Sequence, residues 1–493
     1  MSERLTFGYG RRGGRMDAPA IGSPSVDSSD APEATASVVH RARTRDWAYT
    51  LLFWFTVFLF LRPQNSFALL QALHPTELCA IGATIALVMS RISRGQPVTR
   101  ITPELVGIVA FGAVMLATAP FSVWPGGVIG EFRNGFVKVM IVYVLIVNTV
   151  NTPKRLEAIT WLLVAACGYI GFRAVLDYVR GVNLIENGRV QGALTTIFQN
   201  PNDMALNMVA LLPLAIFFAM RRTKTSHRLF ALACTVVMLG AIVASHSRSG
   251  TVGLAAMMFV LAAFAVRRRP GAVAAGALAL VISLPFLPAS YWERLQSITD
   301  ASKDETGSRE ARETLFRESW RAFVENPLTG VGAGQFVNWD PEGREVPWRE
   351  SHDVFLQVAS EMGIAGFAVF MFLIARWGLS VRDIRIMLRR ERGAARRRHR
   401  AGPGGQGSRA APVATLTPDE RELFDAHSAA MAASLVGWIV CAFFASVAYS
   451  WTFYYLLALA AVPRDLLAAR LRAPADARAS TERPGPWLEA VRA

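Results

Sequence analysis

Three residues, Arg248, Arg312 and His352, can do chemistry that the apolar runs around them do not require. A guanidinium group forms a bidentate pair with phosphate oxygens, so Arg248 and Arg312 are candidates for binding an anion. An imidazole exchanges a proton near neutral pH, so His352 is a candidate general base toward a hydroxyl group. These three residues can form one site only if the fold brings them close together.

Arg312 lies in a segment, 308–325, whose serine start and apolar spacing predict a helix. We expect its apolar stripe to pack against the rest of the protein, with Arg309 and Arg312 turned inward at the amino-terminal end. Arg312 has no acidic residue three or four positions away, whereas Arg317 and Arg321 do. Arg312 is therefore predicted to bind an anion, and the alternative is a surface arginine that reaches lipid headgroups. The stripe consists of Leu315, Phe316, Trp320, Phe323 and Val324.

His352 stands between Ser351 and Asp353, where a polar segment meets an apolar run. A histidine at the mouth of a membrane cavity suits general-base catalysis, and the alternative is a helix cap or a hydrogen-bonding role. Arg248 lies in the short turn 245–250 between two apolar runs, with nothing acidic near it in sequence. That isolation favours anion binding, with a structural role as the alternative.

The segment 199–203, Gln-Asn-Pro-Asn-Asp, opens another apolar run with closely spaced amide and carboxylate groups. The Asn-Pro pair predicts a turn and the aspartate suits a first helical turn, so a structural role explains much of the pattern. The alternative is carbohydrate recognition by Asn200 and Asn202.

The elements that must position these residues are apolar helices. Hydrophobic residues make up 52% of the 493 residues and charged residues only 18%, and apolar runs recur at the length needed to cross about 30 Å of hydrocarbon. The sequence therefore predicts an all-α polytopic membrane protein with about twelve transmembrane helices. The runs cover residues 47–61, 67–89, 105–119, 136–150, 158–176, 204–220, 229–244, 251–266, 272–287, 354–377, 429–445 and 447–462.

Basic residues cluster in alternate connections, so the positive-inside rule places both termini in the cytoplasm. This explains the net charge of +15 and excludes nucleic acid as a partner. The outer connection 289–352 holds eight basic and twelve acidic residues, so its arginines are not topology signals. The four cysteines lie in or beside apolar runs without CxxC spacing and predict no metal site, disulfide framework or cofactor.

The predicted spans divide the chain into seven successive segments. In order they are a disordered cytoplasmic tail (1–45), spans one to nine (46–288), a large periplasmic loop with amphipathic helices (289–352), span ten (353–378), an arginine-rich cytoplasmic loop (379–427), spans eleven and twelve (428–464) and a cytoplasmic tail (465–493).

Taken in this order, the motifs resemble the O-antigen ligase superfamily, which also includes O-antigen polymerases and protein O-oligosaccharyltransferases. The resemblance runs over about 198–366 and rests on NPND, SRSG, the Arg312 helix leading into NPLTGVGAGQF, and SHDVFLQVASEMGIAG. Arg248 matches the arginine of the SRS-type turn, Arg312 the loop arginine and His352 the loop-end histidine. Two departures are Phe316, where the family usually has tryptophan, and Asp353, where it usually has asparagine. Arg309 offers a competing register for the loop arginine.

The resemblance implies a GT-C-like glycosyltransferase architecture in the inner membrane and a metal-independent, inverting transfer. It implies an undecaprenyl-diphosphate-linked glycan donor and a lipid or glycan acceptor, with membrane lipids as the surroundings. Ligase, polymerase and protein glycosyltransferase stay open, as do the sugar, the acceptor and the oligomeric state. A secondary transporter or a structural component of an envelope assembly is the alternative from another class. The expected site consists of Arg248, Arg312 and His352 for catalysis and Arg309, Asn200, Asn202 and Asp353 for substrate binding.

Overall fold

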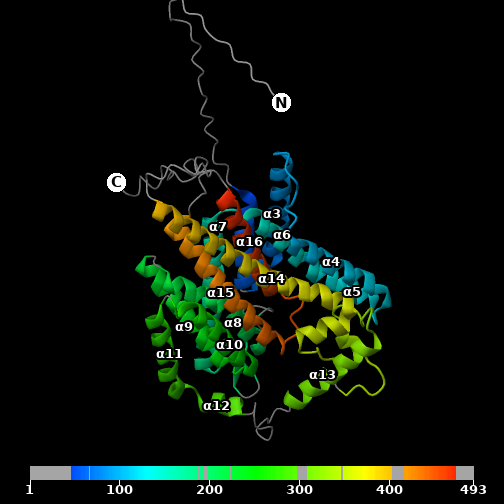
Figure 1. Cartoon of the computed structure of the whole chain (residues 1–493). Coiled ribbons are helices and arrows are strands. Elements are labelled where there is room, and N and C mark those ends of the chain that lie inside the picture. The colour runs from blue at the N-terminus through cyan, green and yellow to red at the C-terminus, as the bar shows by residue number, and fades with distance from the viewer. Residues whose placement is uncertain are drawn as a thin grey trace, which may run out of the picture. The chain divides into compact units, whose positions relative to one another are not determined.

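The computed structural model describes residues 46–65, 67–185, 188–192, 198, 200–221, 224–267, 269–296, 308–345, 348–401 and 416–472. The predicted amino-terminal tail, 1–45, lies outside the described residues, as does most of the predicted carboxy-terminal tail. The described part is almost entirely helical, and its strands are the two-residue β1 (Leu184–Ile185) and β2 (Arg189–Val190), which pair in antiparallel fashion. The chain is an all-α polytopic membrane protein, as the sequence predicts (Figure 1).

The helices are joined by connections of very different lengths. In chain order they are α1 (Trp47–Leu61), η1 (Pro63–Asn65), α2 (Ala68–Ala72), α3 (Pro75–Ile92), α4 (Pro103–Thr118), η2 (Ala119–Phe121), α5 (Pro125–Glu131), η3 (Phe132–Phe136), α6 (Val137–Thr149), α7 (Pro153–Arg180), α8 (Pro201–Met220), α9 (Thr225–Ala244), α10 (Arg248–Ala265), α11 (Pro270–Ser283), η5 (Leu284–Phe286), α12 (Ala289–Gln296), α13 (Ser308–Glu325), η7 (Phe336–Asn338), α14 (Val354–Ala401), α15 (Pro418–Ala442) and α16 (Trp451–Arg472).

Nine helices of the described part are long and apolar enough to cross a membrane: α3, α4, α7, α8, α9, α10, α14, α15 and α16. The apolar helices α1 and α11 are shorter. The predicted span 136–150 falls on α6, which continues α5 through the π-helical η3. The predicted apolar runs thus fall largely on helices, and the number that cross the membrane stays a prediction.

Helix starts follow from proline and polar caps in the sequence. Thr102, Thr152 and Asn200 each accept a backbone N–H of the following helix, and each is followed by a proline in the first turn. Ser247 caps α10 in the same way, and Thr417 forms a capping box with Glu420 at the start of α15. Side-chain oxygens satisfy amide groups that have no partner within the helix, and proline loses nothing there because its position needs no N–H.

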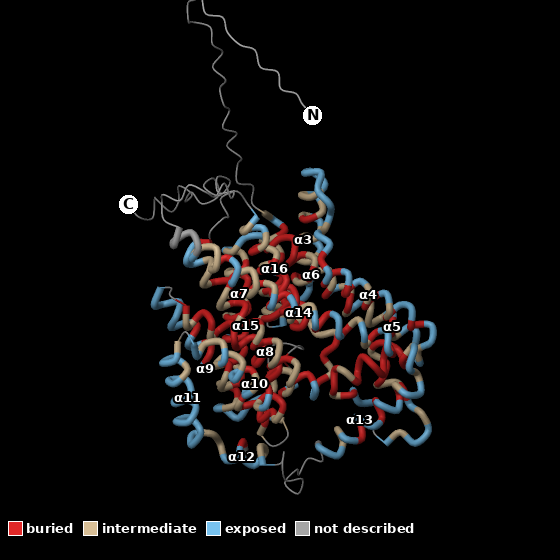
Figure 2. Tube along the Cα trace, in the orientation of Figure 1, coloured by how far each residue is buried: buried red, intermediate tan, exposed pale blue. Residues whose placement is uncertain are grey.

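Burial is concentrated in α8 and α16, whereas α11 has no buried residue (Figure 2). Helix α10 packs on α15, α7 on α9, and α8 on both α9 and α15. Helices that are apolar on every side are typical of the interior of a membrane domain, and an exposed apolar face is typical of contact with lipid.

The predicted cytoplasmic loop 379–427 is helical in much of its described part, because α14 runs on to Ala401 and α15 begins at Pro418. Polar residues mark the end of a membrane span, but they do not end a helix. No proline follows Trp377 within α14, so the helix continues. Ion pairs join the two polar extensions: Arg421 lies 2.6 Å from Glu391 and Arg392 lies 3.3 Å from Asp425.

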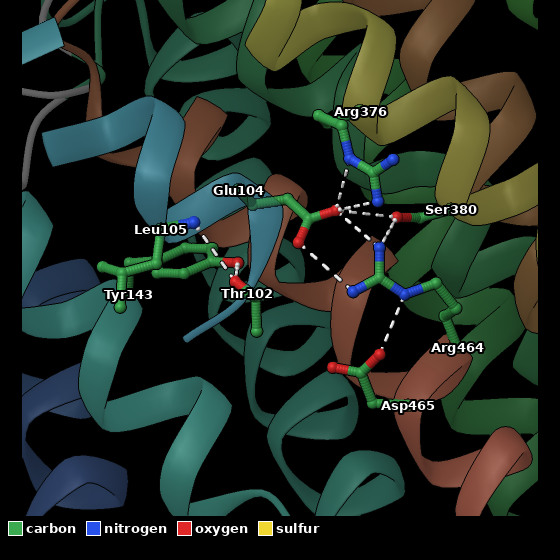
Figure 3. A network of polar contacts seen from close by, with 8 residues as sticks. All are labelled: Thr102, Glu104, Leu105, Tyr143, Arg376, Ser380, Arg464 and Asp465. Atoms are coloured by element: carbon green, nitrogen blue, oxygen red, sulfur yellow. Dashed lines mark hydrogen bonds and ion pairs between the residues drawn. The ribbon is translucent and has the colours of Figure 1, made fainter. Parts of the chain in front are cut away.

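A buried network of charged groups joins α4, α14 and α16 (Figure 3). The fully buried carboxylate of Glu104 accepts hydrogen bonds from Arg376 at 2.9 Å, Arg464 at 2.6 Å and Ser380 at 3.2 Å. Arg464 also donates to Asp465 at 2.8 Å. Two arginines thus face two carboxylates, so the network is electrically balanced.

Candidate active site

Asn200 and Asn202 form hydrogen bonds with other parts of the protein at the start of α8. The side chain of Asn200 accepts the Asn202 N–H at 2.9 Å and so caps the helix. The Asn202 side-chain oxygen accepts from Arg189 at 2.8 Å and from the Ser247 hydroxyl at 2.9 Å. These bonds give both asparagines a structural role at the start of α8.

Arg189 is a residue that the sequence analysis missed. It lies on β2, is only 6% exposed, and donates to the Ser245 carbonyl at 3.1 Å as well as to Asn202. It therefore fixes the turn after α9 against the start of α8. The available signal was the one that marked Arg248, namely an arginine in a connection on the predicted outer side, against the positive-inside bias.

Arg248 is the first residue of α10, directly after the Ser247 cap, whose hydroxyl accepts the Gly250 N–H at 3.2 Å. The partial positive charge of a helix amino terminus adds to the guanidinium charge, and both favour an anion. Nearby His246 is buried, and this burial, with the charges of Arg189 and Arg294, lowers its pKa to about 4. The imidazole of His246 is therefore neutral, so it neither adds to nor offsets the positive charge of Arg248.

The predicted orientation of α13 is wrong. Phe316 is 54% exposed and Trp320 53% exposed, whereas Leu315, Ser319 and Ala322 are buried. An apolar side chain of a membrane protein is equally well placed against lipid, so apolarity alone does not say which face turns inward.

The buried face of α13 distinguishes the two candidate loop arginines, because Arg312 lies on it and Arg309 does not. Arg312 is half-buried and lies three residues before Leu315, on the buried face, and its guanidinium lies 5.8 Å from the centre of the Phe444 ring. Arg309 is exposed and lies on the side of Phe316 and Trp320. Helix α13 packs beside α14, the helix that begins directly after Asp353 (Figure 1).

His352 is held by its backbone. Its N–H donates to the Ser446 hydroxyl at 3.0 Å, and its φ of 52° lies in the left-handed region. The following Asp353 accepts the N–H groups of Phe355 and Leu356 at 2.8 and 3.0 Å and so caps α14. The structure therefore uses Asp353 as a helix cap.

The structure brings Arg312 and His352 into electrostatic range. Burial, reinforced by the positive charges of Arg312 and Arg349, lowers the pKa of His352 to about 4. The imidazole is neutral at physiological pH and can accept a proton. An anion bound by Arg312 would offset the positive charge and raise this pKa again.

The Arg248 turn is linked to His352 less directly. Ser247, beside Arg248, bonds to Asn202, and the next residue, Asp203, lies within electrostatic range of Glu350. Glu350 precedes His352 by two residues. The amino-terminal ends of α8, α10, α13 and α14 thus lie around one region.

The 326–336 segment packs closely against the part of α14 that follows His352. Gly363 has a φ of 63°, which interrupts α14, and a Cβ on Gly330 would lie 2.2 Å from the carbonyl carbon of Glu361. The Glu361 carboxylate accepts the Gly334 N–H and the Tyr449 hydroxyl, each at 2.8 Å. Glu361 therefore joins this segment to the α15–α16 connection that also carries Ser446.

Residues 233–371 match the family described as O-antigen ligase. This match supports membership of the O-antigen ligase superfamily. The O-antigen ligase domain runs from α9 into α14 and contains Arg248, Arg312 and His352, whereas Arg189, Asn202 and the α15–α16 connection lie outside it. A comparison with curated proteins finds no match.

Proposed function

We propose that this protein is a membrane glycosyltransferase of the O-antigen ligase type. It would transfer a glycan from an undecaprenyl-diphosphate-linked donor to a hydroxyl group of lipid A core or another surface acceptor. The observation that carries the proposal is the electrostatic proximity of Arg312 and His352 within the segment that matches the O-antigen ligase family.

In the proposed reaction, Arg312 and Arg248 bind the diphosphate of the donor. His352 takes the proton of the acceptor hydroxyl as its oxygen attacks the anomeric carbon and the bond to phosphate breaks. Inversion at that carbon leaves undecaprenyl diphosphate, whose developing negative charge the guanidinium groups stabilise. The mechanism assigns no role to a metal ion.

We also propose that the protein lies in the inner membrane with both termini in the cytoplasm and the site on the periplasmic side. The alternation of basic connections supports this orientation. It would give Arg248, Arg312 and His352 access to a donor whose glycan has already crossed the membrane.

Substitution tests the proposed roles. We expect Arg312→Ala to lower transfer by about 10²- to 10³-fold and His352→Ala by about 10²- to 10⁴-fold. Arg317→Ala, an exposed arginine of the same helix, is the matched control and should keep wild-type activity. Transfer is measured in membranes as glycan on the acceptor, with protein level followed by immunoblot. Wild-type transfer by Arg312→Ala or His352→Ala at normal protein level would refute the assignment.

Deletion of the gene separates the alternative functions. A ligase leaves long polymer that is not attached to lipid A core, whereas a polymerase leaves single repeat units. A protein O-oligosaccharyltransferase leaves its protein acceptors without glycan. Unchanged surface glycan combined with altered uptake of a small solute would favour a transporter instead.

A further inference from the structure

Helix α13 carries a second apolar surface besides the one that packs inward. Phe316, Trp320 and Val324 follow one another at intervals of four residues and so lie along one side of the helix. Each of these side chains is more than half exposed. The three residues are called the exposed apolar face below. Bulky apolar side chains that line up on a helix surface mark a contact with lipid or with another protein.

The other sides of α13 have a different character. The side that faces the protein is buried and includes Leu315 and Ala322. The side beyond the exposed apolar face is charged: Arg317 is exposed, and Arg321 pairs with Glu325 at 2.7 Å. A helix with a protein side, an apolar side and a charged side suits the boundary between lipid and water.

The exposed apolar face continues onto two helices that are long and apolar enough to cross a membrane, α4 and α14. After α13, the Pro327 carbonyl accepts the Ile364 N–H of α14 at 2.8 Å, and Leu328 and Ile364 are both more than half exposed. The Val331 carbonyl accepts the Val123 N–H, just past the end of α4, at 3.0 Å. Exposed aromatic side chains also stand at this end of α4, namely Phe121 and Trp124. An apolar surface continuous with spanning helices meets the same surroundings as they do, which is lipid.

We propose that α13 lies in the surface of the membrane, with the exposed apolar face in the edge of the hydrocarbon layer. An indole ring has an apolar body and a polar N–H group, so Trp320 suits this depth. The first turns of α13 carry Arg309 and Glu313 on the same side, and both are exposed. The helix therefore enters the lipid with its carboxy-terminal half. In the proposed orientation this lipid belongs to the periplasmic leaflet.

The location of α13 also sets the depth of Arg312. Arg312 lies one turn before Phe316, at the end of the exposed apolar face that stays nearest to water. Its guanidinium is then held at the level of the lipid phosphates, where the diphosphate of a lipid-linked donor would lie. This consequence rests on the proposed function, whereas the location of α13 in the membrane surface does not.

Nitroxide labels on the purified full chain in liposomes test the proposal. Phe316→Cys and Val324→Cys place a label on the exposed apolar face, and Arg317→Cys, on the charged side, is the matched control. All are made in a Cys79→Ser background, because the other three cysteines are buried. Oxygen concentrates in lipid and a nickel chelate stays in water. We expect collisions with oxygen to exceed those with the chelate severalfold at positions 316 and 324, and the reverse at position 317.

Brominated phosphatidylcholine gives a second measurement that needs no cysteine. Bromine quenches tryptophan fluorescence on contact, so the difference in emission between ordinary and brominated liposomes reports the tryptophans in lipid. Of the twelve tryptophans, Trp320 is expected to contribute to this difference, and Trp320→Phe should make it smaller. Trp339→Phe is the matched control, because Trp339 belongs to the same connection between α12 and α14 but is buried. It should leave the difference unchanged.

Each outcome decides for or against the proposal. Oxygen access at 316 and 324 with water access at 317 supports it, as does a smaller difference in Trp320→Phe than in Trp339→Phe. Water access at 316 and 324 overturns it, because the exposed apolar face then lies above the membrane. Labels that meet neither reagent also overturn it, because a second copy of the chain then covers this face. If the cysteine variants do not fold, an unchanged difference in Trp320→Phe overturns it alone. Neither readout involves glycan transfer, so a failure here is distinct from a failure of the proposed function.

Discussion

At the scale of single residues, the surroundings of His352 determine when it can take a proton. Its N–H is bound to Ser446, and burial together with the charges of Arg312 and Arg349 lowers its pKa to about 4. The neutral form, which a general base needs, therefore persists into mildly acidic solution. The proposed negatively charged donor beside Arg312 would change this balance, because it would favour the protonated imidazole.

We expect this change to appear in the pH dependence of transfer. The acid limb of kcat/KM, which reports the free enzyme, should lie near pH 4, the pKa of His352. The acid limb of kcat, which reports the enzyme–donor complex, should lie at higher pH. Rates of the purified enzyme on a lipid-linked donor between acidic and neutral pH measure both.

A substitution checks the electrostatic cause of this pH dependence. Arg349→Gln removes one of the positive charges and should move the acid limb of kcat/KM to higher pH. Arg317→Gln, on the exposed side of α13, should leave it in place. Coincident acid limbs for kcat and kcat/KM in the wild-type enzyme would contradict this account of His352.

At the scale of elements, the position of His352 depends on contacts between segments far apart in sequence. Ser446 and Tyr449 belong to the α15–α16 connection, and Glu361 of α14 binds Tyr449 as well as Gly334. The carboxylate of Glu361 is thus the point at which α14, the 326–336 segment and the α15–α16 connection meet. Movement of one of them is expected to move His352 relative to Arg312.

Tyr449→Phe tests this dependence. Loss of its hydrogen bond to Glu361 should cost about 0.5–1.5 kcal/mol of stability and should also lower transfer, since Ser446 lies three residues away. Tyr143→Phe is the matched control, because it removes a buried hydroxyl that contacts Thr102 at 3.1 Å, away from the site. We expect the two variants to lower the unfolding temperature similarly and only Tyr449→Phe to lower activity. Equal activity in both would show that the Glu361 contact does not position His352.

At the scale of the whole molecule, the Glu104 network holds together helices from both ends of the chain (Figure 3). Its central contact joins Glu104 and Arg464, which lie 360 positions apart. Removal of the carboxylate would leave the partly buried Arg376 and the buried Arg464 with Asp465 as the remaining carboxylate of the network. A buried charge without its partner is far more costly than a surface pair is favourable.

Glu104→Ala should therefore destabilise the protein by about 3–5 kcal/mol. Glu77→Ala is the control, because Glu77 forms a mostly exposed pair with Lys138 at 3.2 Å and its loss should cost at most about 1 kcal/mol. Thermal unfolding in detergent measures both. A Glu104→Ala variant as stable as Glu77→Ala would mean that the network contributes nothing beyond a surface ion pair.

The positions of the helices could be predicted from the sequence, because apolar length, caps and prolines act locally. We expected Arg312 and His352 to lie close together because their motifs resemble those of one family, and the structure places the two side chains within electrostatic range. The inward face of α13 could not be predicted, since the apolar side chains of Phe316 and Trp320 face outward. The role of Glu104 could not be predicted, because its partners lie in distant segments and no local pattern marks such contacts.

The interruption of α14 at Gly363 also bears on how the protein can move. The chain at Pro327 and Leu328 fills the space beside that glycine, and the Ile364 N–H donates to the Pro327 carbonyl at 2.8 Å. The outer part of α14 is thereby locked to the segment that follows α13. We expect α13 and the start of α14 to tilt together, so the distance between Arg312 and His352 should change mainly when the α15–α16 connection moves.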